Sequence, residues 1–153
     1  MAKIAFGKLG LTKNSSTTII NHNEQAIEVK NYLPVNEKLE LISNVINFSA
    51  DENNFANPVK VSVYATLEII EAYTNISFTE KQKEDPCKLY DLFAGNELSS
   101  KIMGAIPSVE LAELLTGIED SIEAVYKDRN SVMGVLDVIQ NDYSGLSLDA
   151  KNI

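Results

Sequence analysis

The feature that most constrains the fold is a long amphipathic helical pattern that starts near Ser108, directly after Pro107. Serine is a favoured N-cap residue, so Ser108 is predicted to cap this helix. A helix with one apolar stripe must bury that stripe against other elements, so the chain must fold as a packed, layered domain. Apolar residues recur at helical spacing on one face: Leu111, Leu114, Leu115, Ile118, Ile122, Val125 and Tyr126. Acidic residues take the other face, which we interpret as solvated: Glu110, Glu113, Glu119, Asp120 and Glu123.

The pattern has two possible endings. It either continues from Val132 to Tyr143 or breaks at Asn130-Ser131 and Gly134, and the sequence favours neither. After Tyr143 the chain is predicted to be a tail.

Two further amphipathic helices are predicted upstream. The first follows Pro34, with Asn36 as its N-cap, and its stripe comprises Leu39, Ile42, Val45, Ile46 and Ser49. The second is opened by Asn57-Pro58 and extends to about residue 74. Its apolar set is Val63, Tyr64, Leu67, Ile70 and Tyr73. Valines at 59, 61 and 63 alternate as in a strand, but the run is too long for a typical strand, so we predict a helix.

Two short helices are predicted between these and the long one. Asp85-Pro86 again combines a capping residue with a proline, and Gly95 closes the helix that it opens. That helix carries Leu89, Tyr90, Leu92 and Phe93. The other precedes Pro107 and carries Leu98, Ile102 and Met103.

The N-terminal part is predicted to be β-rich. Strands are expected near 3–9, 17–21 and 26–31, and the polar run 21–24 between the last two favours a hairpin. The predicted class is therefore α+β, with a small antiparallel hairpin or three-stranded sheet followed by a helical bundle. We predict one domain over 1–153, made of a β-rich part (1–33), a helical body (34–143) and a tail (144–153).

Charge and composition narrow the functions that the chain can have. The 153 residues carry a formal charge of −9 and show no basic stripe, which argues against nucleic-acid binding. No run approaches the roughly 20 apolar residues of a membrane span. A single cysteine, Cys87, and an N-terminus without a signal-peptide pattern favour the reducing cytosol.

No residues combine into a recognisable catalytic or metal site. His22 lies at the predicted turn without a nearby second ligand, and Cys87 lies beside acidic residues that oppose thiolate formation. The acidic run at Asp51 lacks the glycine and glutamate of a calcium loop. We expect a protein that is not an enzyme and has no cofactor or metal. A pocket that gathers Asp51, His22 and Cys87 would point to the enzyme alternative.

Tyrosines are candidate anchors for a partner because they combine an apolar body with a polar tip. Four of them fall on helical apolar stripes, where we expect core packing: Tyr64, Tyr73, Tyr90 and Tyr126. The other two, Tyr32 and Tyr143, flank the helical body. Together with Leu33, they are the predicted partner-binding residues.

The run at 27–42, IEVKNYLPVNEKLELI, resembles proteins from the tail-morphogenesis region of bacteriophages of Gram-positive hosts. Segments 51–64, 75–90 and 126–133 are similar to the same group. The resemblance implies a tail assembly chaperone, which binds the tape-measure protein and the major tail protein in the host bacterial cytoplasm and leaves before the virion is finished. Self-association is compatible with it. Two alternatives are a structural tail or neck protein of the virion and a small phage protein that binds and inhibits a host protein.

Overall fold

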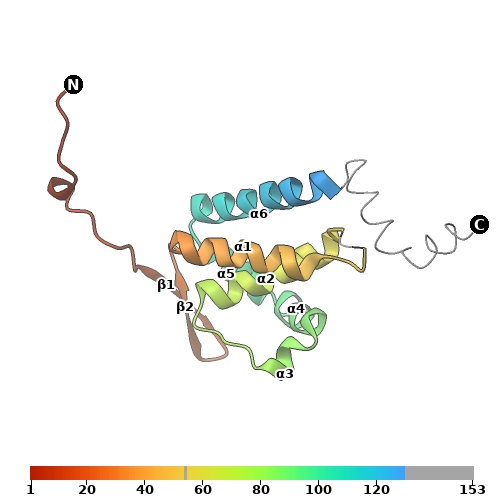
Figure 1. The fold of residues 1–153 in the computed structure, drawn as a ribbon. Coiled ribbons are helices and arrows are strands. Elements are labelled where there is room, and N and C mark those ends of the chain that lie inside the picture. Colours follow the sequence, from red (N-terminus) through yellow and green to blue (C-terminus); the bar gives the residue numbers. More distant parts are fainter. Residues whose placement is uncertain (54, 130–153) are drawn as a thin grey trace, which may run out of the picture.

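The computed structural model describes residues 1–53 and 55–129, which form a two-stranded sheet followed by a helical body (Figure 1). The fold is α+β, as predicted. The strands are β1 (Thr17–His22) and β2 (Gln25–Lys30). The helices are a 3-10 turn η1 (Phe6–Leu9), α1 (Val35–Ser49), α2 (Pro58–Tyr73), α3 (Glu80–Lys83), α4 (Pro86–Gly95), α5 (Leu98–Ala105) and α6 (Ser108–Arg129).

The predicted hairpin is confirmed. β1 and β2 pair antiparallel, from Thr17 opposite Lys30 to His22 opposite Gln25. The two residues of the turn, Asn23 and Glu24, have φ of 46° and 64°. Left-handed backbone at both positions is the arrangement that matches the twist of a two-residue hairpin.

The predicted strand near 3–9 is wrong, and so is the three-stranded sheet. Residues 6–9 form η1 instead, and Gly10 follows it with a left-handed φ of 60°. The apolar alternation breaks at Gly7-Lys8, so these residues lack one continuous face to lay on the body. The unpaired edge of β2 is partly covered by the end of α2, where Thr74 makes an isolated bridge with Val29. The Asn75 side chain also accepts a hydrogen bond from the Glu28 amide at 3.0 Å.

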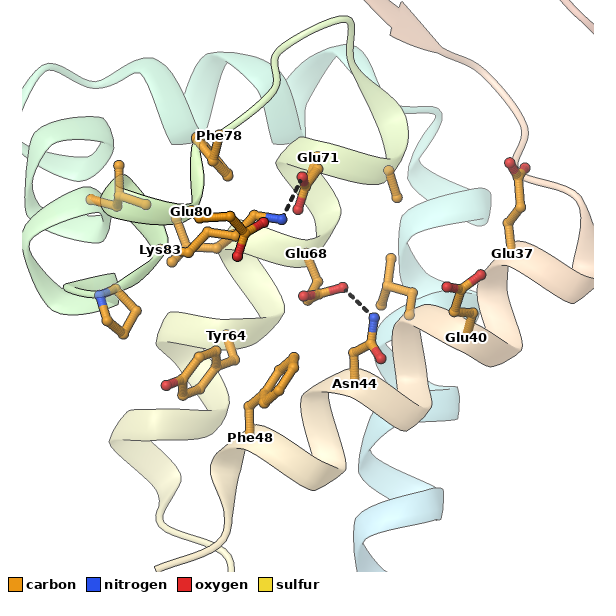
Figure 2. A pocket seen from close by; sticks show the side chains of 15 residues that line it. Glu37, Glu40, Asn44, Phe48, Tyr64, Glu68, Glu71, Phe78, Glu80 and Lys83 are labelled. Carbon is orange, nitrogen blue, oxygen red and sulfur yellow. Dashed lines mark hydrogen bonds and ion pairs between the residues drawn. The ribbon is translucent and has the colours of Figure 1, made fainter.

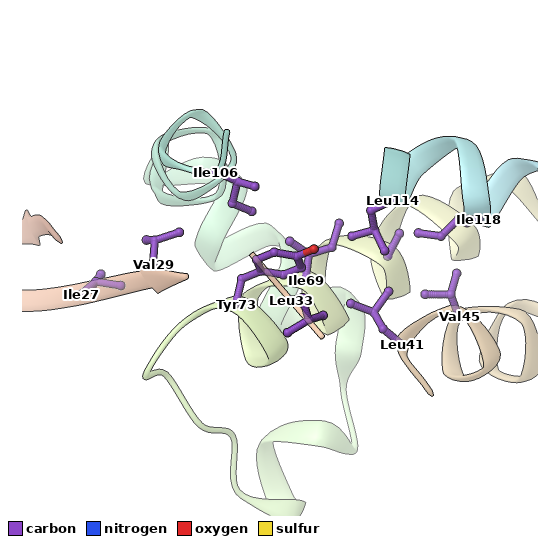
Figure 3. Close-up of a cluster of buried hydrophobic side chains, with 11 residues drawn as sticks. Ile27, Val29, Leu33, Leu41, Val45, Ile69, Tyr73, Ile106, Leu114 and Ile118 are labelled. Atoms are coloured by element: carbon purple, nitrogen blue, oxygen red, sulfur yellow. The ribbon is translucent and has the colours of Figure 1, made fainter. Parts of the chain in front are cut away.

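The helical body has three levels. α1 and α2 run antiparallel through its middle, α6 packs against α1 on one side, and α4 packs against α2 on the other (Figure 1). The main core lies between the hairpin, α1, α2 and α6, and it includes the side chains in Figure 3: Ile27, Val29, Leu33, Leu41, Val45, Ile69, Tyr73, Ile106, Leu114 and Ile118. A smaller cluster of Val63, Leu67 and Leu89 joins α2 to α4. Helix α2 therefore buries two faces.

The predicted caps are right for α2 and α4 and wrong for α1 and α6. Ser108 is the first residue of α6 and not its cap, since the Leu111 amide bonds to the Pro107 carbonyl oxygen at 3.0 Å. The Asn57 side chain caps α2 by accepting bonds from Val59 N and Lys60 N at 3.0 and 3.3 Å. Asp85 caps α4. Helix α1 instead starts at Val35, without a side-chain cap.

The buried stripe of α1 is also shifted from the predicted one. Leu39 is 60% exposed, whereas Leu41, which the predicted stripe left out, is 2% exposed. Val45 and Ser49 are buried as expected. The stripe shifts because α1 contacts both α2 and α6, and the helical period alone does not choose which side faces them.

Two predictions concern C-terminal residues that the structure does not describe. The possible continuation to Tyr143 and the tail at 144–153 lie outside the described residues. Within the described residues, no helix combines the length and the apolar character needed to cross a membrane.

Candidate functional site

A groove of about 630 Å³ lies between α1, α2, α3 and the start of α4 (Figure 2). We call it the acidic groove. Its polar lining residues are Glu37, Glu40, Asn44, Glu68, Glu71, Glu80 and Lys83. Its apolar and aromatic lining residues are Leu41, Phe48, Tyr64, Leu67, Ala72, Phe78, Pro86 and Leu89.

Negative charge dominates the lining, since five glutamates face one lysine. Lys83 pairs with Glu71, with 3.2 Å between Nζ and Oε1. Among the described residues, no ion pair joins Glu37, Glu40 or Glu80 to a cation. The groove therefore has an excess of carboxylates that a cationic group could neutralise.

Glu68 is the carboxylate whose charge the fold disfavours most clearly. Partial burial raises its pKa, and the negative charge of Glu71 raises it further. A hydrogen bond from Asn44 Nδ2 to Glu68 Oε2, at 3.0 Å, opposes both effects. Because a partly buried carboxylate lacks the full solvation of water, a cation bound beside Glu68 would stabilise the charged form.

Aromatic rings stand at one end of the groove. Phe48 from α1 and Tyr64 from α2 lie against each other, with ring centroids 5.4 Å apart (Figure 2). Phe78 lines another part of the groove and packs edge to face on Phe93 of α4. Carboxylates beside aromatic faces suit lysine and arginine side chains, which combine an apolar stem with a cationic head. The groove can therefore hold a basic segment that also has apolar residues.

Glu110 has a different role from the one predicted for it. It is buried, not solvated, and accepts bonds from Leu33 N at 3.0 Å and from the Tyr73 hydroxyl at 2.8 Å. Lys38 Nζ lies 3.0 Å from both carboxylate oxygens. Burial alone would raise the pKa of Glu110, but these donors outweigh it and lower the pKa. We call these four residues the Glu110 network, and it joins α6 to α1, α2 and the chain between β2 and α1.

The structure describes two of the three predicted partner-binding residues, the chain neighbours Tyr32 and Leu33. Leu33 is completely buried in the core, so it offers no surface to a partner in this structure. Tyr32 is 40% exposed, and Lys38 Nζ lies 4.4 Å from the centroid of its ring. Neither lines the acidic groove. Tyr143 lies outside the described residues.

The tyrosines on predicted stripes divide into two pairs. Tyr73 and Tyr126 are buried, as expected for core packing. Tyr64 and Tyr90 are only half-buried, and Tyr64 lines the groove.

The residues considered for chemistry stay apart from the groove. His22 ends β1, Cys87 is exposed in the first turn of α4, and the Asp51 side chain accepts bonds from the amides of its own loop. None of the three lines the acidic groove. The described residues contain no group of three or more histidine, cysteine, aspartate or glutamate side chains that could hold a metal ion.

The sequence contained a signal for the groove that our interpretation did not use. Glutamates recur at three-residue spacing on two consecutive helices, as Glu37 and Glu40 on α1 and as Glu68 and Glu71 on α2. Each pair alone is typical of a solvated face. Only the packing of α1 on α2 makes the two pairs line one groove.

Comparison of the chain with protein-family models, with curated proteins and with solved structures found no match.

Proposed function

We propose that this protein works by contact with other proteins and that the acidic groove binds a basic, partly apolar segment of its partner. The observation that carries the proposal is the combination of five glutamates and three aromatic rings along one hollow. A segment with alternating basic and apolar side chains satisfies both kinds of surface at once. Burial of the aromatic faces supplies affinity, and the carboxylates select for positive charge.

The setting that we propose is bacteriophage tail assembly. The resemblance described above implies a tail assembly chaperone, which contacts the tape-measure protein and the major tail protein in the host bacterial cytoplasm. A chaperone of this kind must hold segments of a long partner reversibly. An open groove with unpaired carboxylates supports such a role, because charge pairs near solvent form quickly and are weak individually.

The test uses tagged chain as bait in cells that assemble the phage tail. Wild-type protein is compared with a groove variant, Glu37→Lys/Glu40→Lys/Glu80→Lys, whose three positions are all exposed. The control is Glu113→Lys/Glu119→Lys/Glu123→Lys, which makes the same charge change at exposed positions of α6 outside the groove. We expect wild type and control to capture the tape-measure protein, and the groove variant to capture at least about tenfold less.

Mass spectrometry of purified virions, together with the capture experiment, separates the alternatives. We expect no stoichiometric copy of the chain in the finished particle. A stoichiometric copy would instead identify a structural tail or neck protein. Capture of a host protein with no tail protein would identify an inhibitor of the host.

A further inference from the structure

Residues 1–16 form a segment that projects from the body, which we call the N-terminal arm (Figure 1). Every one of these residues is exposed. The arm includes four large apolar side chains whose exposed fractions lie between 51% and 76%: Ile4, Phe6, Leu9 and Leu11. Such a concentration of uncovered apolar surface typically marks an interaction site.

The arm is tied to the body only at its base. The backbone oxygen of Ser16 accepts a hydrogen bond from the backbone N–H of Asn31 at 3.0 Å. The side-chain amide of Asn31 also donates a hydrogen bond to the Ser16 hydroxyl oxygen at 3.2 Å. Within the described residues, no hydrogen bond joins residues 1–13 to the body. The arm's apolar side chains belong to neither core cluster of the described residues.

The charge of the arm is opposite to that of the acidic groove. It contains three lysines, Lys3, Lys8 and Lys13, and no acidic residue. Without these three, the chain has 10 basic and 22 acidic residues, a formal charge of −12. The groove lining has five glutamates and one lysine, a formal charge of −4. The most basic segment of the chain and its acidic groove are thus complementary.

The local structure of the arm matches the mixed lining of the groove. Phe6 and Leu9 are three residues apart in η1, and side chains at this spacing lie on the same side of a 3-10 turn. They form an apolar pair that suits the surface around Phe48 and Tyr64. Lysines on both sides of this pair and within it can reach the surrounding carboxylates.

We propose that the N-terminal arm of one copy docks in the acidic groove of a second copy. The proposal rests on the function proposed above, namely that the groove binds basic, partly apolar segments, and it names one such segment. A second copy is favoured over the arm's own body because the arm leads away from that body (Figure 1). Sixteen residues span up to about 50 Å when extended, which is enough to reach a neighbouring molecule.

This contact joins two different surfaces, so it is heterologous. Each copy presents one arm and one groove, and repetition of the contact leads either to a closed ring or to an open, head-to-tail filament. The association depends on screened charges, so raising the salt concentration from 50 mM to 500 mM weakens it.

Sedimentation of the full chain over a range of concentrations tests the proposal. We expect wild type to form oligomers at 50 mM salt. The arm variant Lys3→Glu/Lys8→Glu/Lys13→Glu and the groove variant Glu37→Lys/Glu40→Lys/Glu80→Lys should each self-associate at least about 100-fold more weakly, since like charges then meet. The α6 control variant, Glu113→Lys/Glu119→Lys/Glu123→Lys, should associate as wild type does. Circular dichroism confirms that each variant is folded, because all nine positions are exposed.

A mixture of the arm and groove variants provides the sharpest test. The acidic arm of the first then meets the basic groove of the second, and the wild-type arm of the second meets the wild-type groove of the first. We expect association to return in the mixture. A wild-type chain that stays monomeric at every concentration overturns the proposal, as does a mixture that stays dissociated or an arm variant that associates normally.

The same variants separate this proposal from the proposed function. The arm variant keeps its groove, so we expect it to capture the tape-measure protein at least as well as wild type does. If the groove variant loses self-association but still captures the tape-measure protein, the groove is a self-association site only and the proposed function fails. If the groove variant no longer captures the tape-measure protein, while wild type and both variants are monomeric, the proposed function stands and only the arm proposal is wrong.

Discussion

Two glutamates illustrate how the same residue type takes opposite roles in this molecule. Glu110 accepts three kinds of donor in the interior, and its pKa is lowered. Glu68 is partly buried with an amide donor and a neighbouring carboxylate, and its pKa is raised. The first therefore stabilises the fold as a carboxylate, and the second is retained at a cost in stability. Groups whose charge the fold disfavours are concentrated at binding sites, which agrees with a role for the groove in recognition.

Replacing Glu110 tests the Glu110 network. We expect Glu110→Gln to lower the free energy of unfolding at pH 7 by about 2–3 kcal/mol, because Lys38 is left largely buried without a counter-charge. Glu113→Gln, at an exposed position of the same helix, should change it by less than about 0.5 kcal/mol. Urea denaturation followed by circular dichroism measures both. Equal effects at the two positions would contradict the role assigned to the network.

The pH dependence of this effect has a defined sign. The pKa of Glu110 is lower in the folded state than its ordinary value of about 4.3, so its stabilisation is complete above that value. It is lost as the pH falls through the folded-state pKa. The difference in stability between wild type and Glu110→Gln should therefore shrink as the pH is lowered from about 5 to about 3. A constant difference over that range would show that the charge of Glu110 does not act as described.

Replacing Glu68 should have the opposite effect on stability. Glu68→Gln removes a charge whose pKa the fold raises, so we expect the free energy of unfolding at pH 7 to rise by about 0.5–1 kcal/mol. The gain should disappear as the pH falls through the raised pKa, where Glu68 itself becomes neutral. Thermal unfolding at pH 7 and at pH 4 measures it. A loss of stability at pH 7 would mean that the Asn44 bond outweighs burial.

At the scale of elements, local sequence signals set where several helices begin. Asn57-Pro58 and Asp85-Pro86 both place a capping side chain and a proline where α2 and α4 start. Asn36 lacks this effect, because Pro34 is already the N-cap residue of α1 and Asn36 lies inside the first turn of the helix. Capping is thus a matter of position in the helix, not of residue type alone.

The two asparagines form a matched pair for testing this difference. Asn57→Ala removes the acceptor for two backbone amides and should lower the free energy of unfolding by about 1 kcal/mol. Asn36→Ala removes no capping bond and introduces a better helix former, so it should be neutral or slightly stabilising. Chemical denaturation of both variants gives the comparison. A larger loss at Asn36 than at Asn57 would reverse the assignment of the caps.

At the scale of the whole molecule, the described residues divide into a packed body and an exposed arm. The hairpin belongs to the body, since Ile27 and Val29 lie in the same core as side chains of α1, α2 and α6. The arm at 1–16 contributes nothing to that core. Apolar side chains therefore occur in two settings. In the body they are buried and stabilise the fold, and along the arm they are exposed, where we propose that they contact a second copy.

Truncation distinguishes these two parts. Removal of residues 2–13 should leave the free energy of unfolding within about 0.5 kcal/mol of wild type, measured in dilute protein at high salt. Val29→Ala in β2, at a position with no exposed surface, should instead cost about 2 kcal/mol. If the truncation lowers the free energy of unfolding as much as the core substitution does, the arm is part of the folded body and the proposed docking of the arm in the groove of a second copy is wrong.

Much of the secondary structure was determined by the sequence alone. The hairpin at 17–30, the helices after Pro34, Asn57, Asp85 and Pro107, and the α+β class all followed from apolar period, caps and turns. These signals are local, because they depend on residues only a few positions apart. The predicted strand near 3–9 was wrong because the signal was only local. Weak apolar alternation does not supply the neighbouring strand with which a strand must pair.

Only the tertiary structure decided which faces meet. It placed Glu110 inside the molecule and Leu39 outside it, and it left the arm without a surface of its own body to cover it. It also brought two ordinary pairs of glutamates, from α1 and α2, to one groove. Helical period defines a stripe but not the neighbour against which it packs, and a carboxylate is buried or solvated according to the donors that the rest of the fold brings to it.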